Sequence, residues 1–388
     1  MAARRRNGAG RQRNKQEFFF DYTLLFIVIF LLCFGLVMLY STSSYEANID
    51  FGDSAFYLKK QVKASILGLV VMVIVACIDY HIWERFAMIA YVVSAVMIAL
   101  VLTPLGYAAN GARRWLNIGG MSLQPAEVAK VGMIIFFASL VCKMGPRIRN
   151  RKGFLFTVFW AIPISGEILI ITSNLSSAII IFGIVLMMLF VASPNYKGYI
   201  IAAACTVLVA VLVVLAIAQG IIPEEMSYRF SRIKAWLNPE AYSSGSGFQT
   251  LQALYAIGSG GLFGKGLGQS MQKLGFLPEA QNDMIFSIIC EELGLFGAIA
   301  IIILFMLLVW RFMVIANNAQ DLFGALLVVG TMAHMSIQVI LNIAVVTNSI
   351  PNTGITLPFI SYGGSSIMFL MIEIGMVLSV SRSIKLEK

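Results

Sequence analysis

One aspartate stands where it could act as a general base. Asp283 follows Pro278 and Glu279 at the end of a polar stretch, directly before an apolar run that predicts a helix. A carboxylate at a helix start can be a structural cap, because it accepts backbone amide hydrogens and offsets the helix dipole. A carboxylate exposed among positive charges can instead take the proton from an attacking sugar hydroxyl. The residues leave these two interpretations about even.

A second charged pair lies inside an apolar run. Glu127 and Lys130 are three residues apart, so on a helix they share a face and can form an ion pair. A structural ion pair is one interpretation, and a place in a binding site is the other. The site role gains weight because Arg113 and Arg114 lie in the segment that leads to the same helix.

Two further glutamates follow Asp283 on its predicted helix. Glu291 and Glu292 lie about 12 and 13.5 Å further along, at about 1.5 Å per residue. Adjacent helical residues point in different directions, so the two cannot face one partner. We expect one to support the site and the other to hold helices together. Glu167 and Glu373 are interpreted as structural.

Positive side chains are frequent in the segments that join the predicted helices. Snorkelling to lipid headgroups explains any single one of them. As a set they suggest an anionic ligand such as phosphate or pyrophosphate, since Arg offers bidentate hydrogen bonds and Lys a mobile charge. The set is Lys59, Lys60, Arg113, Arg114, Arg229, Arg232, Lys234, Lys265 and Lys273.

The elements that position these residues are membrane spans. The chain is 59% hydrophobic and only 12% charged, and apolar runs near 20 residues recur along its 388 residues. Backbone amides in lipid need internal partners, and the runs lack the alternation of a barrel, so we predict an all-α, polytopic helix bundle. The roughly ten predicted spans are 22-41, 62-78, 86-104, 124-142, 154-172, 177-193, 198-220, 284-310, 323-347 and 364-381.

Basic residues predict the orientation of the bundle. They concentrate in the amino-terminal tail, after the fourth span and at the carboxyl end, which places both termini in the cytoplasm. Segments 42-61, 105-123, 221-283 and 348-363 then face outward. Within the long extracellular loop between helices 7 and 8, residues 248-257 predict an interfacial helix that stops at Gly258. The predicted organisation is a basic tail 1-21, a transmembrane domain 22-382 and a cytoplasmic tail 383-388.

Several other functions are disfavoured by the residues. The cysteines form no CxxC pair, so a disulfide framework or zinc site is not expected, and His81 and His334 do not suggest a metal centre. Net charge +9 is mostly the topology signal, and no aromatic-basic module predicts nucleic-acid binding. The stretch Gly260 to Lys265 fails as a phosphate loop, because Ser259 and Gly266 occupy required Gly and Ser or Thr positions.

Long ordered motifs recur along nearly the whole chain. They are 55-61 (AFYLKKQ), 111-116 (GARRWL), 122-130 (SLQPAEVAK), 238-239 (NP), 247-249 (GFQ), 258-266 (GSGGLFGKG), 277-283 (LPEAQND), 291-294 (EELG) and 354-366 (GITLPFISYGGSS). In these motifs the chain resembles the SEDS family (shape, elongation, division and sporulation; FtsW, RodA and SpoVE). The double Arg113-Arg114 and the basic tail resemble the FtsW division branch or its sporulation relative more than the elongation branch.

The resemblance implies a peptidoglycan glycosyltransferase that joins lipid II units, with undecaprenyl pyrophosphate as leaving group. It implies a class B penicillin-binding protein and divisome membrane proteins as partners, and no cofactor beyond a possible divalent cation, Mg or Mn. Asp283 matches the family's essential acidic residue and expected base, and Glu127 and Lys130 match its functional pair. The motifs also assign substrate binding to Arg113, Arg114, Lys265, Gln249 and Ser365, and support to Glu291, Glu292 and Pro358.

The chain departs from the family pattern at two places. Gln281, Asn282 and Met284 surround the key aspartate where the family usually has His-Thr before it and Phe after it. The stretch 173-176 (SNLS) replaces the usual Pro-Asp-Leu-Gly and so loses an outer carboxylate. We expect these changes to affect local tuning and metal binding. A lipid-linked precursor transporter and a non-catalytic division scaffold are the alternative functions.

Overall fold

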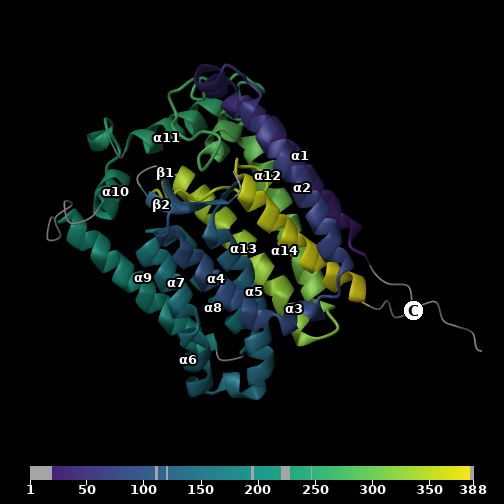
Figure 1. Cartoon of the computed structure of the whole chain (residues 1–388). Coiled ribbons are helices and arrows are strands. Elements are labelled where there is room, and N and C mark those ends of the chain that lie inside the picture. Colours follow the sequence, from purple (N-terminus) through teal and green to yellow (C-terminus); the bar gives the residue numbers. More distant parts are fainter. Residues whose placement is uncertain are drawn as a thin grey trace, which may run out of the picture.

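The computed structural model describes residues 20–109, 112–118, 121–193, 196–219, 228–245 and 247–384. The predicted helix bundle is confirmed, and over most of its described residues each predicted span is helical (Figure 1). The helices are α1 (Tyr22–Phe51), α2 (Phe56–Cys77), α3 (His81–Arg85), α4 (Ala87–Ala99), α5 (Pro125–Met144), α6 (Arg151–Phe159), α7 (Ala161–Ile171), α8 (Leu175–Ala192), α9 (Tyr196–Ala218), α10 (Tyr228–Leu237), α11 (Phe248–Gly260), α12 (Ile285–Asn317), α13 (Leu322–Val346) and α14 (Gly364–Ser383).

The lengths and composition of these helices identify a multi-pass membrane protein. Eight helical segments in the described part of the chain are long and apolar enough to cross a membrane. The predicted span 86-104 corresponds to the shorter apolar stretch Ala87–Leu102, formed by α4 and the 3-10 turn η1 (Leu100–Leu102). Helices α5 and α13 lie at the centre of the bundle, where most of their residues are buried, while α1 and α2 expose apolar side chains outward (Figure 1).

A small sheet lies over one end of the bundle. Strands β1 (Gly106–Ala109), β2 (Ala112–Ile118) and β3 (Met121–Leu123) form an antiparallel sheet in the order β1-β2-β3. The sequence analysis predicted a loop here without strands. The strands are short. In β2, Leu116 is fully buried and the next residue, Asn117, is exposed, so the alternation of buried and exposed side chains that marks a strand is brief. Figure 1 places this sheet at the same end of the molecule as α11, opposite to α6.

The predicted helix of the long loop is α11, but it ends later than expected. It continues through Gly258 to Gly260, and Gly261, with φ +58°, ends it because that conformation suits glycine. Two further 3-10 turns are η2 (Gly145–Arg149), which follows α5, and η4 (Glu240–Tyr242), which precedes α11. The segment after α11, residues 261–284, leads into α12.

Helix α12 is broken in its N-terminal third. Gly294 has φ +68° and ψ −167°, which is not helical, so the helix changes direction directly after Glu291 and Glu292. The backbone of Gly264 and Leu262 packs against this break so closely that a Cβ on Gly294 would lie 2.3 Å from the Gly264 nitrogen. The break therefore receives the glycine-rich segment that follows α11.

Candidate active site

Asp283 is buried between three elements and does not cap its helix. The N-cap of α12 is Met284, and no side chain makes a capping hydrogen bond there. Gln249 of α11 donates from Nε2 to Asp283 Oδ1 at 3.4 Å and to the Pro278 carbonyl at 3.2 Å. The Gly354 position lies on the other side, since a Cβ there would be 3.9 Å from Asp283 Oδ2. Asp283 is thus not the N-cap of α12, and its side chain lies between α11 and the 348–363 segment.

The surroundings of Asp283 give its carboxyl group an unusual proton affinity. Burial raises the pKa of Asp283 to about 7, and the negative charge of Glu279 acts in the same direction. The positive charge of Arg232 and the hydrogen bond from Gln249 oppose this rise in the pKa. A carboxylate whose pKa lies near neutrality can accept a proton in one step and release it in the next.

Asn342 of α13 binds two backbone segments near this carboxylate, the one that contains Asp283 and the one that contains Ile355. Its Nδ2 donates to the Asp283 carbonyl at 2.8 Å and to the Ile355 carbonyl at 2.6 Å. Asn342 is fully buried, so both bonds form away from water. The start of α12 and the 348–363 segment are therefore held against each other at Asp283.

The 348–363 segment is held by further polar contacts. Arg232 donates to the Asn352 carbonyl at 3.1 Å, and Asn352 Nδ2 donates to Gln249 Oε1 at 2.8 Å. Ser176, at the start of α8, donates to the Thr353 carbonyl at 2.6 Å. The segment next to Asp283 is thus joined to α8, α10, α11 and α13.

The predicted pair Glu127 and Lys130 forms a buried ion pair at 2.7 Å. Ser366 Oγ lies 3.3 Å from Glu127 Oε2, and Lys130 Nζ lies 3.5 Å from Gln338 Oε1. Gln338 Nε2 donates to the Thr356 carbonyl at 2.9 Å. The pair is therefore connected through α13 to the same segment that contacts Asp283.

The polar connection continues toward the middle of α13. Because the Thr356 carbonyl can only accept, Gln338 presents Oε1 to His334, and His334 Nε2, at 2.8 Å, must donate. His334 Nδ1 lies 2.8 Å from Glu373 Oε2, so one more proton is shared between that nitrogen and that carboxylate. The contact between His334 and Glu373 thus joins α13 to α14 inside the bundle.

Both predicted arginines are bound to backbone carbonyls. Arg113 donates to the Thr103 and Gly106 carbonyls at 3.2 and 2.9 Å, and Arg114 donates to the Thr172 and Ser173 carbonyls at 3.2 Å each. Asn174, where the family has an acidic residue, caps α8 by accepting from the Ser177 amide. Arg114 thus ties the sheet to the turn between α7 and α8, whereas Arg113 holds β1 and the residue that follows η1.

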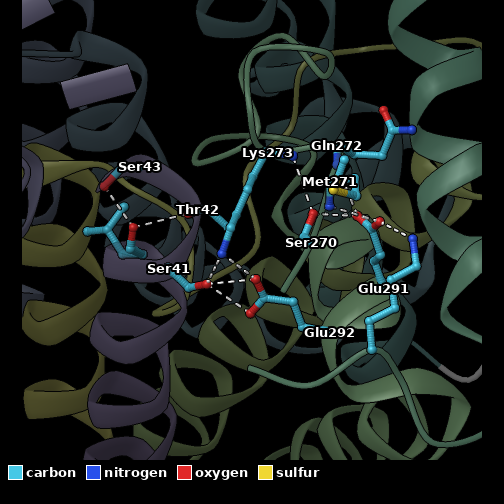
Figure 2. Close-up of polar contacts among 11 residues, drawn as sticks. Ser41, Thr42, Ser43, Ser270, Met271, Gln272, Lys273, Glu291 and Glu292 are labelled. Atoms are coloured by element: carbon cyan, nitrogen blue, oxygen red, sulfur yellow. Dashed lines mark hydrogen bonds and ion pairs between the residues drawn. The ribbon is translucent and has the colours of Figure 1, made fainter. Parts of the chain in front are cut away.

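Glu291 and Glu292 leave α12 in different directions, Glu291 toward Ser270 and Met271 and Glu292 toward Ser41 and Lys273, as Figure 2 shows. Glu291 accepts from Lys265 Nζ at 2.7 Å and from the Ser270 hydroxyl and the Met271 amide. Glu292 accepts from Lys273 Nζ at 2.8 Å and from Ser41 Oγ of α1 at 2.7 Å. The prediction that they cannot share a partner is confirmed. Together they fasten segment 265–273 onto α12, so Lys265 contacts Glu291 and not Asp283.

Two further predicted residues, Pro358 and Ser365, lie in the 348–363 segment and directly after it. Pro358 is buried in the 348–363 segment, and Ser365 is half-buried in the first turn of α14, beside Ser366. Sequence reasoning missed Gln338 and Asn342. Their spacing from His334, one polar residue per turn of an apolar helix, is the signal that would have found them. Predicted cation Arg229 lies outside the residues whose side chains are described.

A metal centre built from protein side chains does not emerge from these residues. Among the residues that the structure describes, no group of three or more His, Cys, Asp or Glu side chains converges as metal ligands. The side chains that influence the Asp283 carboxyl group are the Gln249 amide, by a hydrogen bond, and the Glu279 carboxylate and Arg232 guanidinium, by their charges. A guanidinium is a poor neighbour for a cation, so the described donor set does not fit a divalent ion.

Comparisons with known proteins agree with this arrangement. Stage V sporulation protein E of Bacillus subtilis (strain 168) is 39% identical over 365 residues, covering 93% of this chain and 97% of that protein. A probable peptidoglycan glycosyltransferase FtsW of Trichlorobacter lovleyi is 38% identical over 368 residues, covering 95% of this chain and 94% of that protein.

Solved structures are similar over almost the full length. A chain from the study "Structural coordination of polymerization and crosslinking by a peptidoglycan synthase complex" has a TM-score of 0.77 and 26% identity, covering 94% of this chain and 98% of that one. The rod shape determining protein RodA of Thermus thermophilus has a TM-score of 0.67 and 25% identity, covering 95% and 98%.

The sequence pattern and the fold converge on one family. The family model for FtsW, RodA and SpoVE, described as "Cell cycle protein", matches residues 22–386. The predicted resemblance is confirmed: this chain belongs to the FtsW/RodA/SpoVE family of multi-pass membrane proteins.

Proposed function

We propose that this protein is a peptidoglycan glycosyltransferase that polymerises lipid II into glycan strands at the outer face of the cytoplasmic membrane, during division or sporulation. The observation that carries the proposal is the Asp283 carboxyl group, which is buried at the helix end, accepts a hydrogen bond from Gln249 and has a pKa raised to about 7. Asn342 holds the backbone carbonyl of the same residue. The names of the similar proteins, which include peptidoglycan glycosyltransferase, support the reaction class.

In the proposed reaction Asp283 removes the proton from the acceptor GlcNAc 4-hydroxyl. The hydroxyl oxygen attacks the anomeric carbon of the donor MurNAc with inversion, forming the new glycosidic bond. The bond from that carbon to the phosphate oxygen breaks, and its electron pair leaves with undecaprenyl pyrophosphate. The proton stays on Asp283 until water or buffer takes it, which returns the base to its active form.

Positive side chains would stabilise the departing pyrophosphate. Positioned charge at a leaving group is often the largest catalytic contribution. Arg113, Arg114, Lys130 and Lys265 remain our candidates, although each already contacts protein acceptors. Arg232 joins them, because its charge acts directly on Asp283.

We keep the predicted divalent cation in the proposal as an ion that would bind with the substrate, and no step of the reaction above depends on it. The described residues around Asp283 do not form a set of metal ligands, so binding would have to draw on the substrate pyrophosphate. We further propose both termini in the cytoplasm, a class B penicillin-binding protein that crosslinks the product, and other divisome membrane proteins as partners. The neighbouring structure of a synthase that couples polymerisation and crosslinking supports the first partner.

Lipid II polymerisation by the purified protein, alone and with its crosslinking partner, tests this function. Asp283→Ala should lose about 10² to 10⁴ in rate, because general-base catalysis contributes that much. The matched control is Asp53→Ala, which removes an exposed carboxylate paired with Lys59 in an outer loop and should polymerise at the parental rate. An arm with chelator tests the cation. Polymerisation at the parental rate by Asp283→Ala would refute the proposal and favour a scaffold or transporter.

A further inference from the structure

The outer part of α1 carries a polar face that the proposed reaction does not use. The helix is 30 residues long, about 45 Å at about 1.5 Å per residue, whereas the hydrocarbon core is about 30 Å thick. On its lipid-facing side Phe26, Phe30 and Val37 are exposed and apolar. From Tyr40 onward the same face becomes polar, so the change falls where headgroups begin.

A pocket of about 740 Å³ lies against this polar face. It is bounded by α1 and by segment 267–274, the segment that Glu291 and Glu292 fasten to α12. This size lies within the range of small-ligand sites. Its polar lining consists of Tyr40, Ser41, Ser44, Tyr45, Asn48 and Lys273, besides Ser54.

The lining has little net charge but many hydrogen-bonding groups. Lys273 is the cation in the lining, and its ammonium pairs with Glu292 at 2.8 Å and donates to Ser41 at 2.9 Å. Two of its three hydrogens are thereby used, and its charge is neutralised. Hydroxyl and amide groups next to tyrosine rings suit a neutral ligand rich in hydroxyls better than a bare phosphate.

We propose that this pocket binds the hydroxylated head of a membrane lipid whose tail lies along the apolar face of α1. The continuous change from Phe26, Phe30 and Val37 to Ser44 and Asn48 on one side of the helix matches an amphiphile with its head outward. Two kinds of lipid share this chemistry. One is a bulk lipid with a glycerol or sugar head, and the other is the lipid-linked saccharide, a choice that rests on the proposed function.

Native mass spectrometry of the purified full-length protein, after equilibration with single lipids, tests this site. The probes are monoglucosyl-diacylglycerol, phosphatidylglycerol, phosphatidic acid and lipid II. We expect monoglucosyl-diacylglycerol to be retained about tenfold over phosphatidic acid, since the sugar supplies several hydrogen bonds. Retention of lipid II alone that Ser44→Trp weakens identifies the saccharide carrier as occupant, and retention of all hydroxylated lipids that Ser44→Trp weakens identifies bulk lipid.

Matched substitutions on α1 separate the pocket from general lipid binding. Ser44→Trp fills the pocket, and Asn48→Leu removes a polar group at lower steric risk; both should lose the tenfold preference. Ile49→Trp changes a neighbouring exposed residue that does not line the pocket and should keep it. Equal retention of all probes by the parent protein, or the same preference in Asn48→Leu and Ile49→Trp, would overturn the proposal. Asp283→Asn should keep the tenfold lipid preference, because Asp283 does not line the pocket. The lipid site and the proposed catalytic role of Asp283 can therefore fail independently of each other.

Discussion

At the scale of residues, the Asp283 carboxyl group is present in both its protonated and its ionised form near neutral pH. Its pKa is raised to about 7 mainly because burial penalises the charged form, and Glu279 adds to the rise while Arg232 reduces it. Gln249 provides a hydrogen bond that keeps the carboxylate oriented. These contacts use side chains from separate elements, which makes the site sensitive to their mutual placement.

The buried pair of Glu127 and Lys130 yields a stability prediction. Lys130→Met should destabilise the protein by about 3 to 5 kcal/mol, because it leaves the Glu127 charge buried without its partner. The double variant Glu127→Gln with Lys130→Met should recover most of that loss. Thermal unfolding of the purified variants in detergent measures both. If the double variant were as unstable as the single one, the ion pair would not be the cause.

At the scale of elements, α13 organises the surroundings of Asp283 through one residue per turn. Asn342 holds the Asp283 and Ile355 carbonyls, Gln338 holds Thr356, and His334 holds Glu373. Each of these helix positions faces the interior of the bundle, where water cannot replace a lost hydrogen bond. The helix is thus a support on which separate loops are fixed.

Removing one of these supports should lower activity more than it weakens substrate binding. Asn342→Leu should reduce kcat about tenfold or more with little change in KM, because Asp283 and the 348–363 segment lose their common anchor. Thr331→Val is the control, since Thr331 is buried on the same helix and its hydroxyl has no hydrogen-bond partner. Steady-state polymerisation kinetics provide the measurement. Equal losses in both variants would contradict a positioning role for Asn342.

The break in α12 gives a prediction of its own. Gly294→Ala should destabilise the protein and impair polymerisation, because its φ of +68° disfavours a side chain and the new Cβ would meet Gly264 and Leu262. Gly166→Ala is the control, as a Cβ there meets nothing within 4 Å. Unfolding temperature and activity of the two variants should therefore differ. A stable, active Gly294→Ala would show that the break is dispensable.

How far the sequence predicts these elements depends on the signal each one carries. Spans such as α12 and α13 were predictable because twenty apolar residues have few alternatives to a membrane helix. The strands near Arg113 were not, because their alternation is too brief. The motifs identified Asp283 and Gln249 separately, but not the contact between them, since contacts between distant helices depend on packing that no local pattern records. Asn342 lies outside the motifs, and only its spacing from His334 on α13 marks it.

At the scale of the whole molecule, the polar loops gather at one end of the bundle. The sheet and α11 lie at the end opposite to α6 (Figure 1). The loops predicted to face outward are thus grouped on one side of the helices, as an enzyme acting at one membrane surface requires. The long hydrophobic helices between the two ends fix this separation.

Cysteine labelling in intact cells tests the proposed orientation. In a variant without the native cysteines, Asp53→Cys, in the loop after α1, should react with a membrane-impermeant reagent from outside. Arg147→Cys, in η2 at the other end, should react only after permeabilisation. The reverse pattern would place the site in the cytoplasm and exclude polymerisation at the outer face.

The pH dependence of kcat/KM for lipid II polymerisation tests the central claim most directly, because it reports the ionisation of the free enzyme's base. We predict that the rate falls about tenfold per pH unit below a midpoint near 7, since protonated Asp283 cannot accept a proton. Glu279→Gln should move that midpoint to lower pH, because it removes a charge that raises the pKa of Asp283. A rate that is flat from about pH 5 to 8 would contradict the account.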